Sequence, residues 1–225
     1  MNKLILGIDD AGRGPVIGPM VLAGAIIDKK DEKKLKLLGV KDSKQVSASK
    51  REILIEEIKK TAIDWKVEII TPAEIDGRSG AGLNLNQLEA VKAAAIVNNL
   101  NNGKESMDVV VDCPSNNIPK WQEYLLQHIN NKKNLVFKIE HKADINHVAC
   151  SAASIIAKVT RDSEIEKIKK NLGVDFGSGY PSDPVTIKFL HEHGKKYRKE
   201  GIFRETWQTW QDAKGKKAQK KIDEF

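Results

Sequence analysis

A chain of 225 residues, 40% hydrophobic and 31% charged, is long enough for one globular domain with a substantial core and a small appended element. The formal net charge of +7 at pH 7 suits a polyanionic partner such as nucleic acid, although a solvated lysine-rich surface would give the same excess. No apolar stretch approaches the roughly 20 residues that span a bilayer, and the N-terminal residues do not resemble a signal peptide. We therefore expect a soluble, cytoplasmic protein, and we expect it to be a monomer.

The two cysteines exclude one class of site. Cys113 and Cys150 lie far apart in the sequence, and neither belongs to a CxxC pair. A zinc site or a disulfide framework is therefore not expected, and a reducing compartment is the default.

The first half of the chain predicts three strands and three helices. Short apolar or alternating runs predict strands at 3–9, 20–27 and 65–70. Helical spacing predicts a helix that begins after Ser47 or Ser49 and runs to about Ala62, a short helix from Thr71, and a helix over residues 84–100. Glycine-rich or turn-like segments at 39–44 and 76–82 separate these elements.

The second half alternates strands with helices. Strands are expected at 107–112 and 134–140, and helices at 114–129, from 141–144 through 172, and at 185–198. A turn cluster at 177–184 precedes the last of these, and Trp207 and Trp210 indicate a final helical packing element. The basic residues 213–225 are predicted to form a flexible tail. The order predicts an α/β fold in which helices cover a mixed sheet.

Four acids occupy positions that suggest chemistry. Asp9 and Asp112 each end an apolar strand, Asp10 follows Asp9, and Asp144 lies just before a helix. Ligands collect at the carboxyl ends of strands, so these side chains can converge if the strands are neighbours. Carboxylates without His or Cys select Mg²⁺ or Mn²⁺, and two such ions about 4 Å apart serve phosphodiester hydrolysis. From the pattern alone, acids that merely cap helices or lie in loops remain an open alternative.

The order of several motifs resembles the ribonuclease HII family, and looks closest to its archaeal branch. The resemblance covers about residues 4–210. Its blocks, in chain order, are GIDDAGRGPVIGPMVLAG (7–24), KDSK (41–44), NLNQLE (84–89), VVVDC (109–113), HKAD (141–144), SAASIIAKVTRD (151–162), GSGYPSDP (177–184) and R-x-x-W (204–207).

The resemblance implies a fold and an activity. The fold would be ribonuclease H-like, a five-stranded mixed sheet flanked by helices with a helical C-terminal element. The corresponding division is a catalytic domain at 1–172, the helical element at 173–212, and the tail at 213–225. The activity would be that of ribonuclease H (EC 3.1.26.4). It would hydrolyse the RNA strand of RNA/DNA hybrids and cut 5′ of ribonucleotides embedded in duplex DNA, leaving 3′-hydroxyl and 5′-phosphate ends. Such an enzyme would serve ribonucleotide excision repair.

The resemblance also assigns roles to residues. Asp9, Asp10, Asp112 and Asp144 match the family's metal-binding catalytic acids, which would hold two divalent ions. The loop formed by Gly12, Arg13 and Gly14 matches the segment that grips the ribonucleotide 2′-hydroxyl through its backbone. Tyr180 matches the residue that packs on the sugar just beyond the junction. Arg13 and Lys44 are expected phosphate contacts, although Lys44 could equally be a solvated charge.

Two positions depart from the family pattern. The second acid of the family is glutamate, whereas this chain has Asp10, whose reach is about 1.5 Å shorter. Metal sites demand tight distances, so the rate or the choice of metal could change. The segment after Asp144 contains His147 where the family has a Tyr-Pro pair, and we expect a structural role for this histidine.

The C-terminus carries a second recognisable pattern. Gln219, Ile222 and Phe225 have the spacing Q-x-x-I-x-x-F. It resembles the peptide with which replication and repair proteins dock on the sliding clamp, where apolar side chains enter a pocket. A random terminus with one aromatic residue is the alternative.

Two other functions remain open from the sequence. The first is a hybrid-binding protein that Asp10 has left catalytically impaired. The second is a different nuclease of the same fold, such as an integrase or junction resolvase. The Gly12–Gly14 loop and Tyr180 argue against the second, because neither is needed where there is no ribose to read.

Overall fold

The computed structural model describes the backbone of residues 3–220 and the side chains of residues 3–214. The chain forms two compact units. Among the described residues, the sheet unit comprises 3–11, 21–69 and 83–160, and the helical unit comprises 12–20, 70–82 and 161–220. The chain therefore passes between the units several times, whereas the sequence predicted one boundary after residue 172 and another after 212. The reason is that residues 12–20 and 70–82 belong to the same unit as the distant C-terminal segments.

The sheet has five strands in the order β3-β2-β1-β4-β5. Their bounds lie close to the predicted ones: β1 (Leu4–Ala11), β2 (Met20–Asp28), β3 (Asp64–Ile70), β4 (Met107–Asp112) and β5 (Leu135–Glu140). Strand β1 runs antiparallel to β2 and parallel to β4, and β4 runs parallel to β5. The predicted five-stranded mixed sheet is confirmed, and it brings the ends of β1 and β4 side by side.

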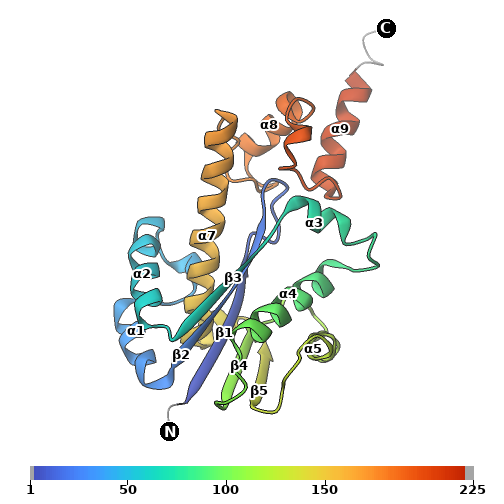
Figure 1. Cartoon of the computed structure of the whole chain (residues 1–225). Helices are drawn as coiled ribbons and strands as arrows, with labels where there is room; N and C mark the ends of the chain where they lie inside the picture. The colour runs from blue at the N-terminus through green and yellow to red at the C-terminus, as the bar shows by residue number, and fades with distance from the viewer. Residues whose placement is uncertain (1–2, 221–225) are drawn as a thin grey trace. The chain divides into compact units, whose positions relative to one another are not determined.

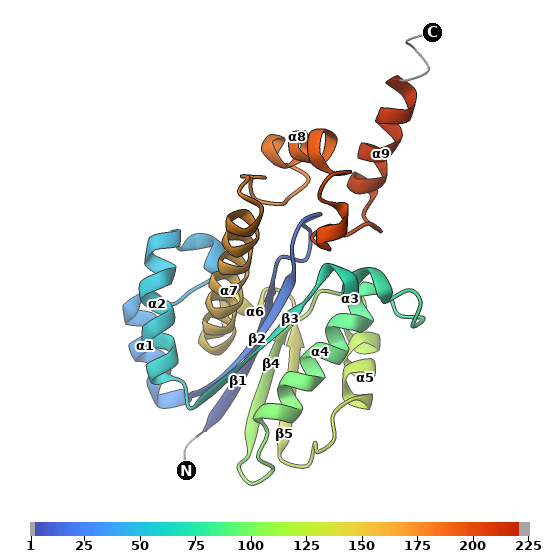
Figure 2. The same ribbon diagram turned by 45° about the horizontal axis from the view of Figure 1, so that its top comes forward.

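Helices cover the two faces of this sheet (Figures 1 and 2). One face carries α1 (Glu32–Leu38), α2 (Ala48–Thr61) and the first half of α7 (Val148–Leu172), whose apolar side chains form one core with β1 and β2. The other face carries α4 (Leu85–Leu100) and α5 (Ile118–Gln127). Gly7 lets α7 approach closely, since a Cβ there would lie 2.1 Å from the carbonyl carbon of Ala149.

Helix starts follow capping chemistry. The Ser47 hydroxyl accepts a hydrogen bond from the Lys50 N–H and begins α2, and Asn84 forms a capping box with Gln87 at the start of α4. The predicted start of α5 at residue 114 is wrong, because Asn117 accepts the Lys120 N–H and begins the helix there. Helix α1 was not predicted. Leu35 is its only buried residue, so the segment shows no apolar periodicity.

The helical unit has its own aromatic core. It contains α3 (Pro72–Gly77), the second half of α7, α8 (Pro184–His193) and α9 (Gln208–Lys220). An antiparallel bridge pairs Ile17 with Phe203, and the core includes Phe176, Phe189 and Trp210. Helix α8 stops five residues before its predicted end at 198. A 3-10 turn over Arg198–Glu200 follows it.

The predicted tail begins inside a helix, because the backbone of α9 continues to Lys220. Ile222 and Phe225 lie outside the described residues, as does the side chain of Gln219. In the described part of the chain, no helix is long and apolar enough to cross a bilayer. Cys113 and Cys150 are both buried, and neither forms a disulfide.

Candidate active site

The catalytic acids predicted from the sequence gather at one edge of the sheet. In the parallel pair of β1 and β4, Ile8 lies opposite Val111, so Asp9 and Asp112 follow at the same level. Asp10 is the next residue of β1. Asp144 lies in the short helix α6 (Ala143–Asn146), which follows β5. The sheet unit therefore brings all four acids into one region, as the strand ends predicted.

Backbone hydrogen bonds orient these carboxylates. Asp9 Oδ1 accepts the N–H of Asp10 at 2.7 Å, and Asp112 Oδ1 accepts the N–H of Ala143 at 3.0 Å. The carbonyl oxygen of Asp144 accepts the Ser151 hydroxyl at 2.6 Å, which ties α6 to α7. The acids are therefore mounted on two strand ends and a braced helical turn rather than on free loops.

Burial and mutual repulsion perturb the acids. Burial raises the pKa of Asp9 well above its usual range, and the charges of Asp10 and Asp112 raise it further. Burial also raises the pKa of Asp112, which the N–H groups of Ala143 and Lys142 only partly offset. The pKa of Asp144 is raised by burial and by the charge of Asp112. Three neighbouring carboxylates with raised pKa values indicate a functional site.

Lys44 is placed beside the acids. Its side chain is exposed, and the charges of Asp144, Asp42, Asp9 and Asp10 raise the pKa of its ammonium group against the lowering effect of partial burial. Lys44 thus supplies positive charge close to the acid cluster. Its expected phosphate contact stays a prediction.

The donor set fits hard divalent cations. The acids offer carboxylate oxygens, which Mg²⁺ and Mn²⁺ prefer, and their charges repel one another inside a buried region. Among the described residues, no three Asp, Glu, His or Cys side chains already converge on one point that could hold an ion. Asp9 and Asp112 instead face backbone N–H groups, and Asp144 shares a hydrogen bond with Asp42.

Three further residues of this region were not predicted. Asp42 is buried and hydrogen-bonds Asp144, Ser154 hydrogen-bonds Asp9, and Glu89 lines a small cavity with Asp9, Asp10 and Asp112. Asp42 belongs to the KDSK block and Ser154 to the SAASIIAKVTRD block. The sequence of neither block indicates what these two residues contact. The detectable signal for Glu89 was an acid on the apolar face of a helix, since Leu88, Glu89 and Ala93 are all buried.

The predicted sugar-reading loop is built within the helical unit. Gly12 adopts φ 81°, and a Cβ there would lie 2.9 Å from the carbonyl oxygen of Pro19, so only glycine fits without strain. Gly14 is exposed, and a Cβ there would meet only Tyr180, at 3.8 Å. The side chain of Arg13, between them, is half-buried.

Arg204 holds this loop from behind. Its side chain is fully buried, at 0% exposure, and its guanidinium donates to the carbonyl oxygens of Gly12 (2.6 Å), Arg13 (2.7 Å) and Gly18 (3.0 Å). The indole N–H of Trp207 donates to the carbonyl of Gly14 at 3.3 Å. The R-x-x-W block therefore organises the loop, a role that its sequence did not reveal.

Tyr180 stands next to the loop, and its contact with the sugar stays a prediction. Its ring lies over the guanidinium of Arg161, 5.1 Å from the ring centroid, and is half-buried. Arg161 is buried on α7 and donates to the carbonyl of Ser178 at 2.7 Å, while its side chain closes against Gly12. Arg161 thus positions Tyr180 and the loop together, and it was not singled out from the sequence.

His147 takes part in a surface ion cluster. Its Nε2 lies 3.0 Å from Glu140 Oε1 and 3.0 Å from Lys138 Nζ. These contacts brace the end of β5.

Comparison with known proteins identifies the family. The sequence model of the family described as ribonuclease HII matches residues 6–210. The chain belongs to the ribonuclease HII family. It is 44% identical over 224 residues to ribonuclease HII of Pyrococcus furiosus, a match that covers 97% of this chain and 96% of the relative. Members of this family are endonucleases of the ribonuclease H class, and the chain is such an enzyme.

Solved structures agree with the fold of this ribonuclease HII. The crystal structure of ribonuclease H2 from Pyrococcus horikoshii has a TM-score of 0.82 at 39% identity and covers 95% of this chain and 98% of its own. A PCNA:RNase HII complex from Archaeoglobus fulgidus gives a TM-score of 0.79 at 38% identity and covers 91% of this chain and 95% of the other. The ribonuclease H-like fold is thereby confirmed.

Proposed function

We propose that this ribonuclease HII hydrolyses the RNA strand of RNA/DNA hybrids and cuts 5′ of ribonucleotides embedded in duplex DNA. The observation that carries the proposal is the placement of Asp9, Asp112 and Asp144 in one region at the ends of neighbouring strands, where burial and their mutual charges raise their pKa values. Asp9, Asp10, Asp112 and Asp144 would hold two divalent ions, Mg²⁺ or Mn²⁺, whose chemistry is to activate a water and to stabilise the leaving 3′ oxygen. The products would carry 3′-hydroxyl and 5′-phosphate ends.

The chain's own groups would place the substrate. The backbone of Gly12–Gly14 can approach a ribose closely. The guanidinium of Arg204 already donates hydrogen bonds to the carbonyl oxygens of Gly12 and Arg13. The backbone N–H groups of the Gly12–Gly14 loop are the natural partners for the 2′-hydroxyl, the group that distinguishes RNA from DNA. Lys44 and Arg13 would contact phosphates, and Tyr180 would pack on the next sugar.

The proposal is tested with labelled 20-nucleotide duplexes of three kinds: RNA/DNA, DNA/DNA and RNA/RNA. With Mg²⁺ or Mn²⁺ only the RNA strand of the hybrid should be cut, and excess chelator should stop the reaction. If the protein binds the hybrid but does not cleave it with any divalent ion, the alternative of a catalytically impaired hybrid-binding protein would be favoured. Equal cleavage of DNA/DNA would favour another nuclease of the same fold.

Asp10 is expected to bias the metal preference. Its shorter reach is less suited to Mg²⁺, which demands near-ideal octahedral geometry at about 2.0–2.1 Å, than to Mn²⁺. Asp10→Glu should therefore raise the Mg²⁺-supported rate more than the Mn²⁺-supported rate. Initial rates of both proteins with both ions measure this. An unchanged ratio of the two rates would mean that the scaffold already compensates for the missing methylene.

Removal of the Tyr180 ring should weaken cleavage at an RNA–DNA junction. Stacking of this kind is worth roughly 1–3 kcal/mol, which corresponds to about 5- to 150-fold in kcat/KM for Tyr180→Ala. Tyr180→Phe keeps the ring and is the matched control, with activity near that of the parent. If the alanine variant cuts a single-ribonucleotide duplex as fast as the parent, Tyr180 does not contact the substrate.

A clamp-docking role is proposed for Gln219, Ile222 and Phe225. The Archaeoglobus fulgidus relative was solved as a complex with PCNA, which supports docking by this family on the sliding clamp. We further propose that the protein acts in the cytoplasm as a monomer, in ribonucleotide excision repair.

A further inference from the structure

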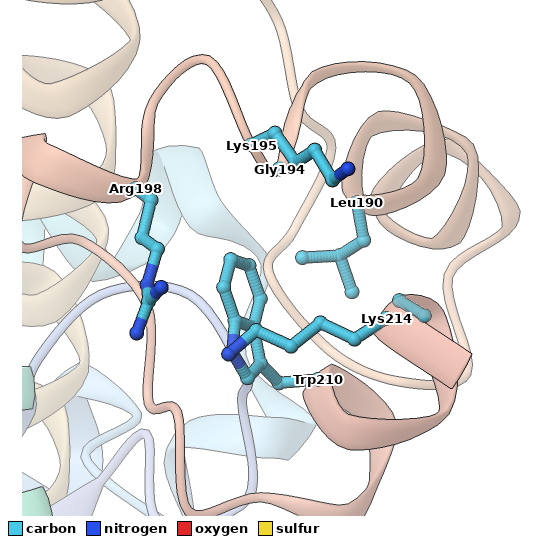
Figure 3. A pocket seen from close by; sticks show the side chains of 7 residues that line it. Leu190, Gly194, Lys195, Arg198, Trp210 and Lys214 are labelled. Atoms are coloured by element: carbon cyan, nitrogen blue, oxygen red, sulfur yellow. The ribbon is translucent and has the colours of Figure 1, made fainter. Parts of the chain in front are cut away.

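A cavity in the helical unit involves none of the residues assigned above to substrate or metal. Its volume is about 350 Å³, and α8, α9 and the segment between them line it (Figure 3). The lining combines apolar side chains, those of Leu190, Trp210 and Ala213, with basic ones, those of Lys195, Arg198 and Lys214, which are called the rim below. Figure 3 shows the Leu190 methyl groups, the Trp210 ring and the lysine stems facing a common space.

Trp210 leaves a polar group to be satisfied. The residue is 2% exposed, and its indole Nε1 is buried without a hydrogen-bond partner among the described residues. Buried indole N–H groups usually find an acceptor. Trp210 lines the cavity, and a carboxylate or carbonyl oxygen of an occupant that reaches Nε1 would supply one.

The rim carries more positive charge than its neighbours neutralise. Glu205 pairs with Arg198 at 2.8 Å and with Lys214 at 3.5 Å, so one carboxylate faces two cations. Lys195 is exposed, and no ion pair of it is found among the described residues. The rim therefore complements an acidic ligand.

The ring geometry favours a peptide over a nucleic acid. Base binding by a tryptophan needs an open ring face. Here Phe203 stacks on Trp210 with 4.4 Å between ring centroids, and the Lys214 ammonium lies over the ring at 5.2 Å. An aliphatic or aromatic side chain needs only the apolar space beside Leu190 and Ala213.

We propose that this cavity is a docking site for an acidic peptide segment of a partner protein. One apolar side chain fills the cavity, and flanking carboxylates face Lys195, Arg198 and Lys214. The site is independent of the catalytic acids, and its test requires neither substrate nor metal.

The test follows the ¹⁵N–¹H indole resonance of Trp210 in the full chain, assigned by its loss in Trp210→Phe. The probe is the acetylated hexapeptide Glu-Asp-Leu-Phe-Asp-Glu, titrated at low salt. Saturable movement of this resonance is expected. Two control peptides are compared with this probe: one has Ala-Ala in place of Leu-Phe, and the other has lysine in place of every acid. Both should bind at least about fivefold more weakly than the probe.

Two charge reversals locate the site on the protein. Lys195→Glu should weaken binding of the acidic peptide by about fivefold or more, whereas Lys199→Glu should change the affinity for the peptide by less than about twofold. Lys199 lies close in sequence and makes the same charge change, but it does not line the cavity.

Four outcomes would overturn the proposal. The first is no movement of the Trp210 resonance at millimolar peptide, and the second is equal weakening by both reversals. The third is a change in the Trp210 resonance when residues 221–225 are deleted and no peptide is present. The end of the chain itself would then be the occupant of the cavity. A 12-nucleotide DNA strand that moves the resonance as strongly as the acidic peptide would assign the cavity to nucleic acid instead.

Discussion

Asp9→Asn should reduce cleavage of the RNA strand by more than about 100-fold and should, at the same time, make the metal-free protein more stable. Replacing a group that merely supports a metal ligand already costs 10- to 100-fold, so loss of a direct ligand should exceed that range. The gain in stability follows from burial and from repulsion by Asp10 and Asp112, which raise the pKa of Asp9 in the folded state. Asparagine keeps the shape and removes the charge.

The gain in stability of Asp9→Asn over the parent should become smaller as the pH falls. A carboxyl group whose pKa is raised by folding destabilises the fold when it is ionised, so the penalty is full above the folded-state pKa. It fades as the pH falls through that value and is absent below the pKa of the unfolded chain. The difference in Tm between Asp9→Asn and the parent, measured in chelator, should therefore shrink on acidification.

A surface acid provides the control for both effects. Glu52→Gln removes an exposed charge on α2 and should leave activity and Tm near those of the parent. If Asp9→Asn retains parental activity, Asp9 is not a metal ligand. If it is inactive but also less stable at neutral pH, then the carboxylate is held by an interaction stronger than the repulsion described here.

Arg204→Met is expected to have the second large effect, on both stability and substrate choice. It removes the donors to three backbone carbonyls, those of Gly12, Arg13 and Gly18. A buried polar group left unsatisfied costs about 1–3 kcal/mol, and methionine fills the volume without replacing any of the bonds. The Tm should fall clearly, and the protein that remains folded should lose its preference for ribonucleotide-containing duplexes.

Equilibrium binding separates these two consequences. Affinities for a single-ribonucleotide duplex and for the same duplex in DNA form should converge in Arg204→Met, measured below its Tm. Arg198→Met is the matched control, since the exposed pair of Arg198 with Glu205 is worth only about 0.2–1 kcal/mol. An Arg204→Met protein with unchanged discrimination would show that the loop keeps its shape without this anchor.

The contrast between Asp9 and Arg204 shows what the sequence could predict. An acid at the end of an apolar run is visible in the sequence, and the parallel pairing of β1 with β4 then brings Asp9 level with Asp112. The five strands were predictable for the same reason, because each is a short apolar or alternating run. The helix α1 was not, since a single buried leucine gives no periodicity.

Long-range partners could not be read from the chain. Arg204 lies 192 residues from Gly12, whose carbonyl it binds, and nothing near Arg204 in the sequence indicates that its guanidinium is buried. Asp42 and Ser154 likewise act through contacts with Asp144 and Asp9 that only the fold creates. Residue type and local order predicted which acids lie together, whereas the residues that support them depend on tertiary packing.

The central claim is most directly tested on a DNA duplex that carries one ribonucleotide, compared with the identical all-DNA duplex. Incubation with Mg²⁺ or Mn²⁺, followed by mapping of both ends on a sequencing gel, reads the position and chemistry of the cut. The account predicts a single cut on the 5′ side of the ribonucleotide, with 3′-hydroxyl and 5′-phosphate ends and no cleavage of the all-DNA duplex. Cleavage of both duplexes at equal rates, or no cleavage of either with both ions, would contradict it.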